Sequence, residues 1–509
     1  MISQADIANR LPITIAMMLG TIMTSLDTTI ANVALPHVQG SLSASVDQIT
    51  WVLTSYLIAT AVMTPMAGWL SARFTRKTVL LWSVGGFTVA SMLCGAAQNI
   101  GEIVMFRMLQ GLFAAPLMPL SQAMVLDLWP PRQVAQVMSI WGMTMILGPI
   151  VGPTLGGWLT DDFSWRWVFY INLPVGILTF IGLWLFMEGG EQTPVRRFDF
   201  IGFGALSIMV GAAQLLLDRG PTVDWFSARE CWVYLVVAGT ALYVFAVQTL
   251  SAEHPFVPRA LALDRNFVIC CMFGLFLGVM MFASMSLLPP MMQTYMGYTA
   301  LQSGIVGISR GVGTFFAMFF VGRLMGRIDV RGLMAVGFTI SAIALWMMTG
   351  FDLSMDATPM VVSGLVQGFG MSLIFMPISL TAFSTLDPVF RADAAGIYNL
   401  VRSLGGSIGI SIMQAIWTSN AAVAHAGMVE HIRPGDPVVG LAMPHIFDFS
   451  AEGGMGLAAL NGDITRQAAM VAYIDDFKLM MVLSIVVIPF LLLLRPAKRA
   501  PEAVHAITD

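Results

Sequence analysis

The chain has 509 residues, of which 57% are hydrophobic and 11% are charged, whereas roughly a quarter of the residues of an ordinary soluble domain are charged. Its mean hydropathy of +0.79 excludes an ordinary soluble protein and indicates an all-α polytopic membrane protein, because helices satisfy their own backbone hydrogen bonds in lipid. The formal net charge of −4 is small, and we expect no nucleic-acid partner. The cysteines lie in or beside apolar runs, so no disulfide framework is expected.

Cutting the apolar runs at charges and turn residues predicts fourteen membrane-spanning helices. They lie near residues 14–35, 50–71, 78–97, 102–125, 136–158, 167–187, 200–218, 229–249, 267–289, 303–322, 332–350, 358–384, 396–419 and 474–495. The segment before the first span shows no cleavable-signal pattern, so this span is expected to be retained.

An even number of spans places both termini on the same side of the membrane. Most Lys and Arg residues fall in the segments on that side, including Arg73, Arg76, Lys77, Arg323, Arg327, Arg331, Arg495, Lys498 and Arg499. The opposite side holds Arg166, Arg219, Arg229, Arg433 and Arg466. This asymmetry predicts that both termini are cytoplasmic.

The first span, residues 14–35, carries one carboxylate, Asp27. A charged side chain near the centre of a bilayer costs at least about 2.5 kcal/mol, so such residues usually face a protein interior or an aqueous cavity. Polar residues lie on and beside its side of the helix, namely Thr21, Thr24, Ser25, Thr28 and Asn32. Asp27 either hydrogen-bonds a neighbouring helix or has a function, and the cost of burying it favours a function.

Basic residues and a buried arginine follow in the next spans. The loop at 68–77 carries Arg73, Arg76 and Lys77, which are topology charges or part of a gate. Span four carries Arg107 about two turns from its start. At about 1.5 Å of rise per residue, Asp27 and Arg107 lie at depths that a long arginine side chain can bridge. We therefore expect them to pair, and a proton or ligand would compete with the arginine for the carboxylate.

Span five, at 136–158, contains two Gly-Pro steps four residues apart. Glycines with this spacing share one face of a helix and let another backbone approach closely, and prolines bend the helix. A packing seam would explain the glycines, but two Gly-Pro steps in register favour a hinge or seal. The residues are Gly148, Pro149, Gly152, Pro153, Gly156 and Gly157.

Internal repetition divides the chain into two halves. The sequence around Gly68 and Arg73 recurs around Gly322 and Arg327, at an offset of 254 residues. Gln110-Gly111 recurs as Gln367-Gly368, and Gly148 with Gly152 recurs as Gly405 with Gly409, both at an offset of 257. Neither Asp27 nor Arg107 has a charged counterpart in the second half, so we expect energy coupling in the first.

The repeat predicts a 6+2+6 arrangement: a six-helix half at 1–187, two inserted helices and linkers at 188–266, and a second six-helix half at 267–495. A cytoplasmic tail follows at 496–509. Two parallel six-helix halves are the plan of the major facilitator transporters, in which the substrate path lies between the halves.

Several segments resemble the fourteen-span drug:proton antiporters of the major facilitator superfamily, and EmrB-type multidrug efflux permeases in particular. They are residues 26–36, 107–111, 148–157, 165–174 and 398–402, so the similarity covers nearly the whole chain. The loop at 68–77 departs from the superfamily pattern. It has Ala72 where an acid is common and Thr75 where a glycine is common, which puts the gate-closing interaction credited to that acid in doubt.

The resemblance implies proton-driven efflux of lipophilic compounds across the bacterial inner membrane, with Asp27 as the proton-coupling acid and Arg107 as its partner. The run at 148–157 would form the antiporter seal, and Gly68, Arg73, Arg76 and Lys77 the cytoplasmic gate. To the substrate cavity we assign Thr24, Thr28, Asn32, Gln110, Arg310, Asn399 and Arg402. Members of this family often work with a periplasmic adaptor protein and an outer-membrane channel. No enzymatic activity, cofactor or metal site is expected.

The predicted periplasmic loop at 420–473 is the longest and contains His425, His431 and His445. Their irregular spacing favours solvated histidines over a metal site, and the loop is either an adaptor contact or a disordered lid. The acid pairs Asp161-Asp162 and Asp475-Asp476 lie at the outer boundaries of spans, where we expect solvated helix ends.

Three arginines within the spans, Arg107, Arg310 and Arg402, face one clearly buried acid. This balance favours neutral compounds or lipophilic weak acids over dications as substrates. Three alternatives remain: a proton-coupled importer of the same fold, a non-transporting membrane receptor, and a membrane-embedded enzyme. An enzyme such as a lipid-linked sugar transferase would need metal-binding carboxylates in sizeable loops.

Overall fold

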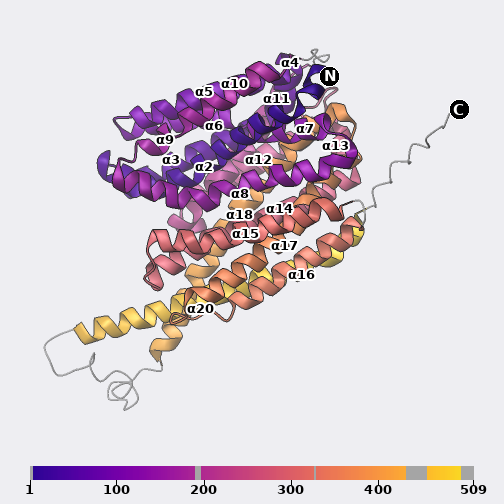
Figure 1. Ribbon diagram of the computed structural model, residues 1–509. Helices are drawn as coiled ribbons and strands as arrows, with labels where there is room; N and C mark the ends of the chain where they lie inside the picture. The colour runs from indigo at the N-terminus through magenta and orange to yellow at the C-terminus, as the bar shows by residue number, and fades with distance from the viewer. Residues whose placement is uncertain (1–3, 190–196, 326–327, 431–454, 495–509) are drawn as a thin grey trace.

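The computed structural model describes residues 4–189, 197–325, 328–430 and 455–494, which are helical and contain no β-strand (Figure 1). The first group of helices is α1 (Gln4–Ala8), α2 (Arg10–Ser41), α3 (Val46–Met63), η1 (Thr64–Met66), α4 (Ala67–Phe74), α5 (Arg76–Ala96), α6 (Ile100–Ala114), α7 (Leu117–Leu128), α8 (Pro131–Asp162), α9 (Trp167–Tyr170) and α10 (Asn172–Phe186). Next come α11 (Phe200–Arg219), η2 (Gly220–Thr222), η3 (Trp225–Ser227) and α12 (Arg229–Ser251).

The remaining helices are α13 (Arg259–Leu263), α14 (Arg265–Pro290), the π-helical turn η4 (Met291–Tyr295), α15 (Ala300–Leu324), α16 (Val330–Met348), α17 (Ala357–Ser384), η5 (Pro388–Phe390), α18 (Arg391–Glu430), α20 (Met455–Val487) and η6 (Ile488–Leu493). The predicted tail at 496–509 lies outside the described residues.

Local sequence explains several helix boundaries. A capping box between Ser45 and Gln48 starts α3, because each side chain satisfies a free backbone N–H of the first turn. Pro131 occupies the first position of α8, where its missing N–H costs nothing. The predicted span at 102–125 is broken into α6 and α7 at Ala115 and Pro116, because proline disrupts a helix interior.

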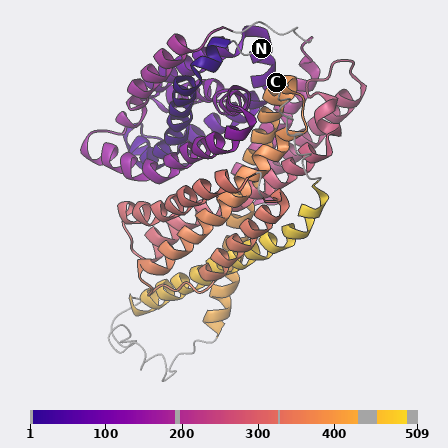
Figure 2. The ribbon, with the colours of Figure 1, turned by 45° about the vertical axis from the view of Figure 1, so that its right-hand side comes forward.

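The helices form two bundles joined along one seam (Figures 1 and 2). In the first bundle α2 packs on α8 and α10, and α6 packs on α3 and α5. In the second, α17 packs on α15 and α16, and α18 packs on α14 and α20. Between the bundles, α8 lies along α15, and α18 contacts η1, α4 and α7. The helix α11 contacts both α3 and α18, so it touches both bundles.

Twelve helical segments of the described chain are long and apolar enough to cross a membrane. Neither α8 nor α18 is among them, although they have 32 and 40 residues and cover the predicted spans at 136–158 and 396–419. In α18, glycine, serine and other polar residues lower the hydropathy. In α8, the side chains of several residues lie outside the part of the chain that is described. The count of fourteen spans therefore stays a prediction.

The expected loop at 420–473 is partly helical. The helix α18 continues to Glu430, and α20 begins at Met455. Residues 431–454, with His431 and His445, lie outside the described residues.

Candidate functional site

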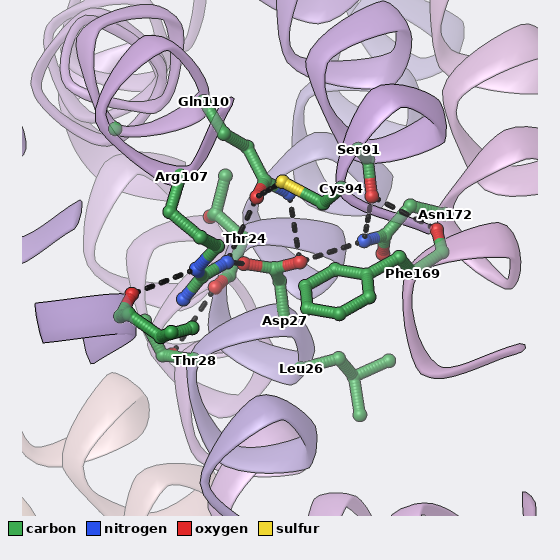
Figure 3. Close-up of polar contacts among 12 residues, drawn as sticks. Thr24, Leu26, Asp27, Thr28, Ser91, Cys94, Arg107, Gln110, Phe169 and Asn172 are labelled. Carbon is green, nitrogen blue, oxygen red and sulfur yellow. Dashed lines mark hydrogen bonds and ion pairs between the residues drawn. The ribbon is translucent and has the colours of Figure 1, made fainter. Parts of the chain in front are cut away.

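Asp27 lies at the centre of a buried polar network in the first bundle (Figure 3). The residue is only 1% exposed. Its Oδ2 accepts a hydrogen bond from Arg107 Nη1 at 2.6 Å, and its Oδ1 accepts bonds from Gln110 Nε2 and Asn172 Nδ2, each at 2.8 Å. Three helices, α6, α10 and α2 itself, thus supply the carboxylate and its donors. The predicted contact between Asp27 and Arg107 is present.

Arg107 is fully buried. Its Nη1 also donates to Gln110 Oε1 at 2.8 Å, and its Nε donates to the Val52 carbonyl of α3 at 3.3 Å. The guanidinium carbon lies 4.3 Å from the centroid of the Tyr56 ring, a favourable cation–π distance. Taking a charge pair out of water is costly, and it is tolerated only where the remaining polar atoms are satisfied. The carboxylate, with three donors, meets this condition, whereas Arg107 Nη2 has no hydrogen-bond partner among the described residues.

Asn172 was not among the predicted site residues. It begins α10 after a break at Ile171, and its Nδ2 also donates to Ser91 Oγ at 2.9 Å. Ser91 in turn donates to the Phe169 carbonyl at 2.8 Å, which fixes its position on α5. The sequence signal was available, because Asn172 is an amide in an apolar span, but only the fold places it beside Asp27.

The polar residues of α2 that were predicted to share a cavity with Asp27 do not hydrogen-bond its carboxylate. Thr24 and Thr28 donate to carbonyls of their own helix, one turn earlier. Asn32 is exposed on α2 and takes no part in the bonds around Asp27. Of the predicted cavity residues in the first bundle, only Gln110 hydrogen-bonds the carboxylate, because the hydroxyls of Thr24 and Thr28 are engaged with backbone carbonyls.

The other predicted cavity residues lie in the second bundle. Arg402 is 3% exposed, and its Nη2 contacts Met118 Sδ of α7 at 3.4 Å and Asn399 Oδ1 at 3.2 Å. Asn399 Nδ2 donates to Gln122 Oε1 of α7 at 3.0 Å. These contacts join α18 to α7 across the two bundles.

Arg310 donates from Nη2 to Gln367 Oε1 of α17 at 2.5 Å. No carboxylate pairs with Arg310 or Arg402 among the described residues. Two guanidinium groups therefore lie within the second bundle without a neutralising acid.

Three glycines of α8, at 148, 152 and 156, face the helix of Asp27. A Cβ at Gly148 would come within 2.4 Å of the Ser25 backbone, and one at Gly152 within 2.1 Å of Thr29 Oγ1. Ser25 Oγ donates to the Met145 carbonyl at 2.7 Å, and Thr29 Oγ1 to the Gly148 carbonyl at 3.0 Å. This face, at residues 148, 152 and 156, is a close helix–helix contact of the kind that small residues allow.

Two other members of the predicted seal point elsewhere. Nothing lies within 4 Å of a Cβ placed on Gly157, so it is not part of the face that packs on α2. Pro153 lies near Gly304 of α15, toward the second bundle. The side chain of Pro149 lies outside the part described.

The predicted gate segment has its own ion-pair network. Arg76 Nη1 donates to Asp127 Oδ2 of α7 at 2.8 Å, and Arg391 of α18 binds the other oxygen of the same carboxylate. Gly68 packs directly against Asp393 of α18. Asp127 was not predicted as a site residue. It supplies an acid at the end of the bundles where the segment 68–77 has Ala72 in place of the acid common in the superfamily.

The other two gate residues lie apart from this network. Lys77 Nζ donates to the Trp184 carbonyl at 3.0 Å, and Arg73 is exposed.

One prediction about the acid pairs is wrong. Asp161 and Asp162 are exposed, and Asp475 is partly exposed, as expected for helix ends. Asp476 is fully buried, because α20 extends well before the predicted span at 474–495 and packs on α18 there. The count of one clearly buried acid must therefore be corrected. Within the described residues no three His, Cys, Asp or Glu side chains gather in a way that could hold a metal ion.

Comparisons with known proteins agree with this architecture. Residues 17–410 match the Major Facilitator Superfamily. The multidrug export protein EmrB of Escherichia coli is 36% identical over 426 residues, which cover 83% of each chain. The fatty acid resistance protein FarB of Neisseria gonorrhoeae is 33% identical over 486 residues, 95% of this chain and 96% of that one.

Among solved structures, the human organic anion transporter MFSD10 superposes with a TM-score of 0.60 at 15% sequence identity, over 94% of this chain and 99% of that one. This likeness concerns the fold alone. The family match and the two bacterial relatives establish that the chain belongs to the major facilitator superfamily, as an EmrB-type permease.

Proposed function

We propose that this protein exports lipophilic compounds in exchange for protons by alternating access. The observation that carries the proposal is the buried network in which Arg107, Gln110 and Asn172 hold the carboxylate of Asp27. A permanently buried ion pair is a poor way to stabilise a fold, and an acid within a membrane helix marks a proton or ligand path by default. The multidrug export name of the relative EmrB supports the direction of transport.

In the proposed cycle a proton arriving from the outside binds Asp27. The neutral carboxyl group no longer attracts the guanidinium of Arg107, and the contact that joins α2 to α6 weakens. The glycine face of α8 lies directly against α2 at Ser25 and Thr29, so a shift of α2 reaches the seam between α8 and α15. The two halves then rock, and loss of the proton to the cytoplasm restores the ion pair for the next substrate.

The proposed architecture has fourteen spans in a 6+2+6 arrangement, with α8 and α18 as spans five and thirteen. Both helices lie between other long helices, where their glycines and polar residues meet protein rather than lipid. Both termini are proposed to be cytoplasmic in a bacterial inner membrane. A periplasmic adaptor and an outer-membrane channel would then meet the side that carries residues 420–473.

For substrates we propose neutral compounds and lipophilic weak acids. Arg310 and Arg402 have no acidic partner among the described residues, and Arg402 bridges α18 and α7 between the bundles. A buried guanidinium favours an anionic or hydrogen-bond-accepting group. The fatty acid resistance name of the relative FarB fits this chemistry. A dication transported as well as a weak acid would contradict the assignment.

Proton movement in inside-out membrane vesicles tests the function. A panel of lipophilic weak acids and cations is added to vesicles containing the wild type, Asp27→Asn or Asp162→Asn. Asp162 is an exposed acid of α8 and serves as the matched control. We expect substrate-dependent proton release from the vesicles in the wild type and in Asp162→Asn, and none in Asp27→Asn.

Each other outcome has a definite meaning. Equal signals from all three proteins would remove Asp27 from the mechanism. Substrate binding without proton movement in the wild type would favour the receptor alternative. Proton movement coupled to uptake in the same direction would favour the importer.

A further inference from the structure

Asp476 of α20 is a second buried carboxylate within the candidate membrane spans, in the half opposite to Asp27. It is 0% exposed, against 1% for Asp27. The two acids differ in their partners. Asp27 accepts three hydrogen bonds, whereas neither carboxylate oxygen of Asp476 has a hydrogen-bond partner in the described part of the chain.

An aromatic cluster covers the approach to Asp476 along α20. Tyr473 lies one turn before Asp476, a spacing that places both side chains on one face of the helix. The Tyr473 ring centroid is 5.3 Å from that of Trp417 on α18 and 6.1 Å from that of Tyr295 in η4. The rings of Tyr295 and Trp417 are 6.2 Å apart. These three residues, here called the aromatic cluster, join η4, which follows α14, to the middle of α20 and to α18.

The other helices around this turn of α20 present apolar groups. Phe477 packs on Phe351, which follows α16, with ring centroids 6.0 Å apart. Further along, Ser484 meets Met280 of α14. No basic side chain reaches Asp476 from these elements in the residues described. In this part of the chain, Asp476 thus lacks an arginine partner like that of Asp27.

The charged groups of α20 on either side of Asp476 are engaged with other groups. Asp475 pairs with Lys478 at 3.1 Å, and both side chains are about half exposed. Arg466 pairs with Asp463 at 3.6 Å and donates to the Tyr295 carbonyl at 3.1 Å. His425 of α18 bonds Asn461. Within one turn of Asp476 on α20, the titratable groups are Tyr473, the negative Asp475 and Lys478, which pairs with Asp475. Tyr295 joins them through its ring contact with Tyr473.

Among the described residues, an ionised carboxylate at this position would have no donor and no counter-ion, and it would have a like charge beside it. Burial of this kind strongly disfavours the charged form. A purely structural polar group would be expected to find a partner, because nearly all buried polar groups in native proteins do. The neutral, protonated form is the one that fits the site.

We propose that Asp476 is a second proton-carrying group of the transporter, protonated in the conformation described and deprotonated when the aromatic cluster separates. The O–H bond of the carboxyl group then breaks, the proton passes to water admitted between α18 and α20, and the resulting carboxylate is hydrated. Its link to transport rests on the proposed function, whereas its protonation does not.

Infrared spectroscopy of the purified full-length protein tests the protonation directly. A buried protonated carboxyl group has a C=O band separate from those of carboxylates. We expect this band at neutral pH in the wild type and in the matched control Asp475→Asn, and its loss in Asp476→Asn. A spectrum in which Asp476→Asn loses no such band would overturn the proposal.

Proton counting in reconstituted vesicles tests the coupling. With the transported compound found for the wild type, we expect Asp476→Asn to move fewer protons per substrate, down to about half, while Asp475→Asn moves the wild-type number. An unchanged count in Asp476→Asn would overturn the coupling and leave a silent buried carboxyl group. If the wild type moves no protons, the coupling fails together with the proposed function, and the infrared band decides the protonation alone.

Discussion

At the scale of single residues, Asp27 and Asp476 are buried acids of candidate membrane spans that lie in contrasting environments. Asp27 is compensated by a guanidinium and two amides, whereas neither oxygen of Asp476 has a hydrogen-bond partner among the described residues. In a low-dielectric interior such partners decide whether a carboxyl group is stable with or without its charge. The two sites are therefore suited to opposite protonation states in the same conformation.

A double-mutant cycle tests the buried ion pair. We expect Asp27→Leu and Arg107→Leu each to lower the free energy of unfolding by about 3–5 kcal/mol, because each leaves a charge buried without its partner. The double variant should lose much less than the sum of the two. Thermal and denaturant unfolding of the purified proteins in detergent measure these values. Additive losses would show that the two side chains do not interact.

At the scale of helices, the glycine face of α8 and the cap of α5 carry the main packing arguments. The face at 148, 152 and 156 brings the backbone of α8 against α2, which supports the packing-seam interpretation of the Gly-Pro run. A seal between the halves remains a proposal. Thr75, the N-cap of α5, has a φ of 69° and a ψ of 150°, a conformation that is favourable only for glycine.

Alanine substitutions on α8 distinguish glycines that pack against α2 from a glycine that does not. A Cβ at Gly148 or Gly152 meets α2 at under 2.5 Å, whereas one at Gly157 meets nothing within 4 Å. We expect Gly148→Ala and Gly152→Ala each to destabilise the protein by about 1–3 kcal/mol through overpacking, and Gly157→Ala to have little effect. Melting temperatures in detergent, with transport rates beside them, distinguish the three. A large loss in Gly157→Ala alone would contradict the assignment of the packed face.

Backbone strain predicts a stabilising substitution at position 75. Thr75→Gly should raise the free energy of unfolding by about 1 kcal/mol, since glycine adopts this conformation without strain and loses only a few tenths of a kcal/mol at an N-cap. Thr75→Ala is the matched control. It keeps the strain and removes the cap bond to the Thr78 N–H, so it should be less stable than the wild type. The reverse order of the two variants would exclude strain at this residue.

At the scale of the whole molecule, the two bundles meet along α8 and α15, and α18 joins them at the end that carries Arg76. There the carboxylate of Asp127 binds an arginine from each bundle, Arg76 and Arg391. Close packing of Gly68 on Asp393 reinforces the same contact. This end is therefore closed by specific pairs rather than by apolar contact alone.

Removing the acid Asp127, which binds Arg76 and Arg391, should let the two bundles separate at the end that carries these residues. We expect Asp127→Asn to shift the equilibrium between conformations by roughly tenfold away from the one described, because two charge-assisted hydrogen bonds are weakened. Spin-label distances between α7 and α18 measure the shift. Arg73→Gln changes an exposed residue of the segment 68–77, close to Arg76, and should leave the distances unchanged. Identical distance distributions in all three proteins would show that Asp127 does not hold the bundles together.

Local sequence rules predicted most of the helices and the central ion pair. Apolar runs of about 20 residues identify membrane helices because the bilayer thickness sets their length. The regular rise of a helix then placed Asp27 and Arg107 at similar depths. The predicted ends of the helices were less accurate. The break at Pro116 and the extension of α18 and α20 into 420–473 depend on a proline and on packing partners that hydropathy does not register.

The sequence by itself determined that this chain is a helical membrane protein with an internal repeat, because composition, apolar length and recurring motifs are local properties. Only the tertiary structure decided which polar residues meet. It brought Asn172 to Asp27, placed Asp127 between Arg76 and Arg391, turned Asn32 away, and buried Asp476. These contacts join segments far apart in the chain, and their partners depend on which helix faces pack together, which no single span encodes.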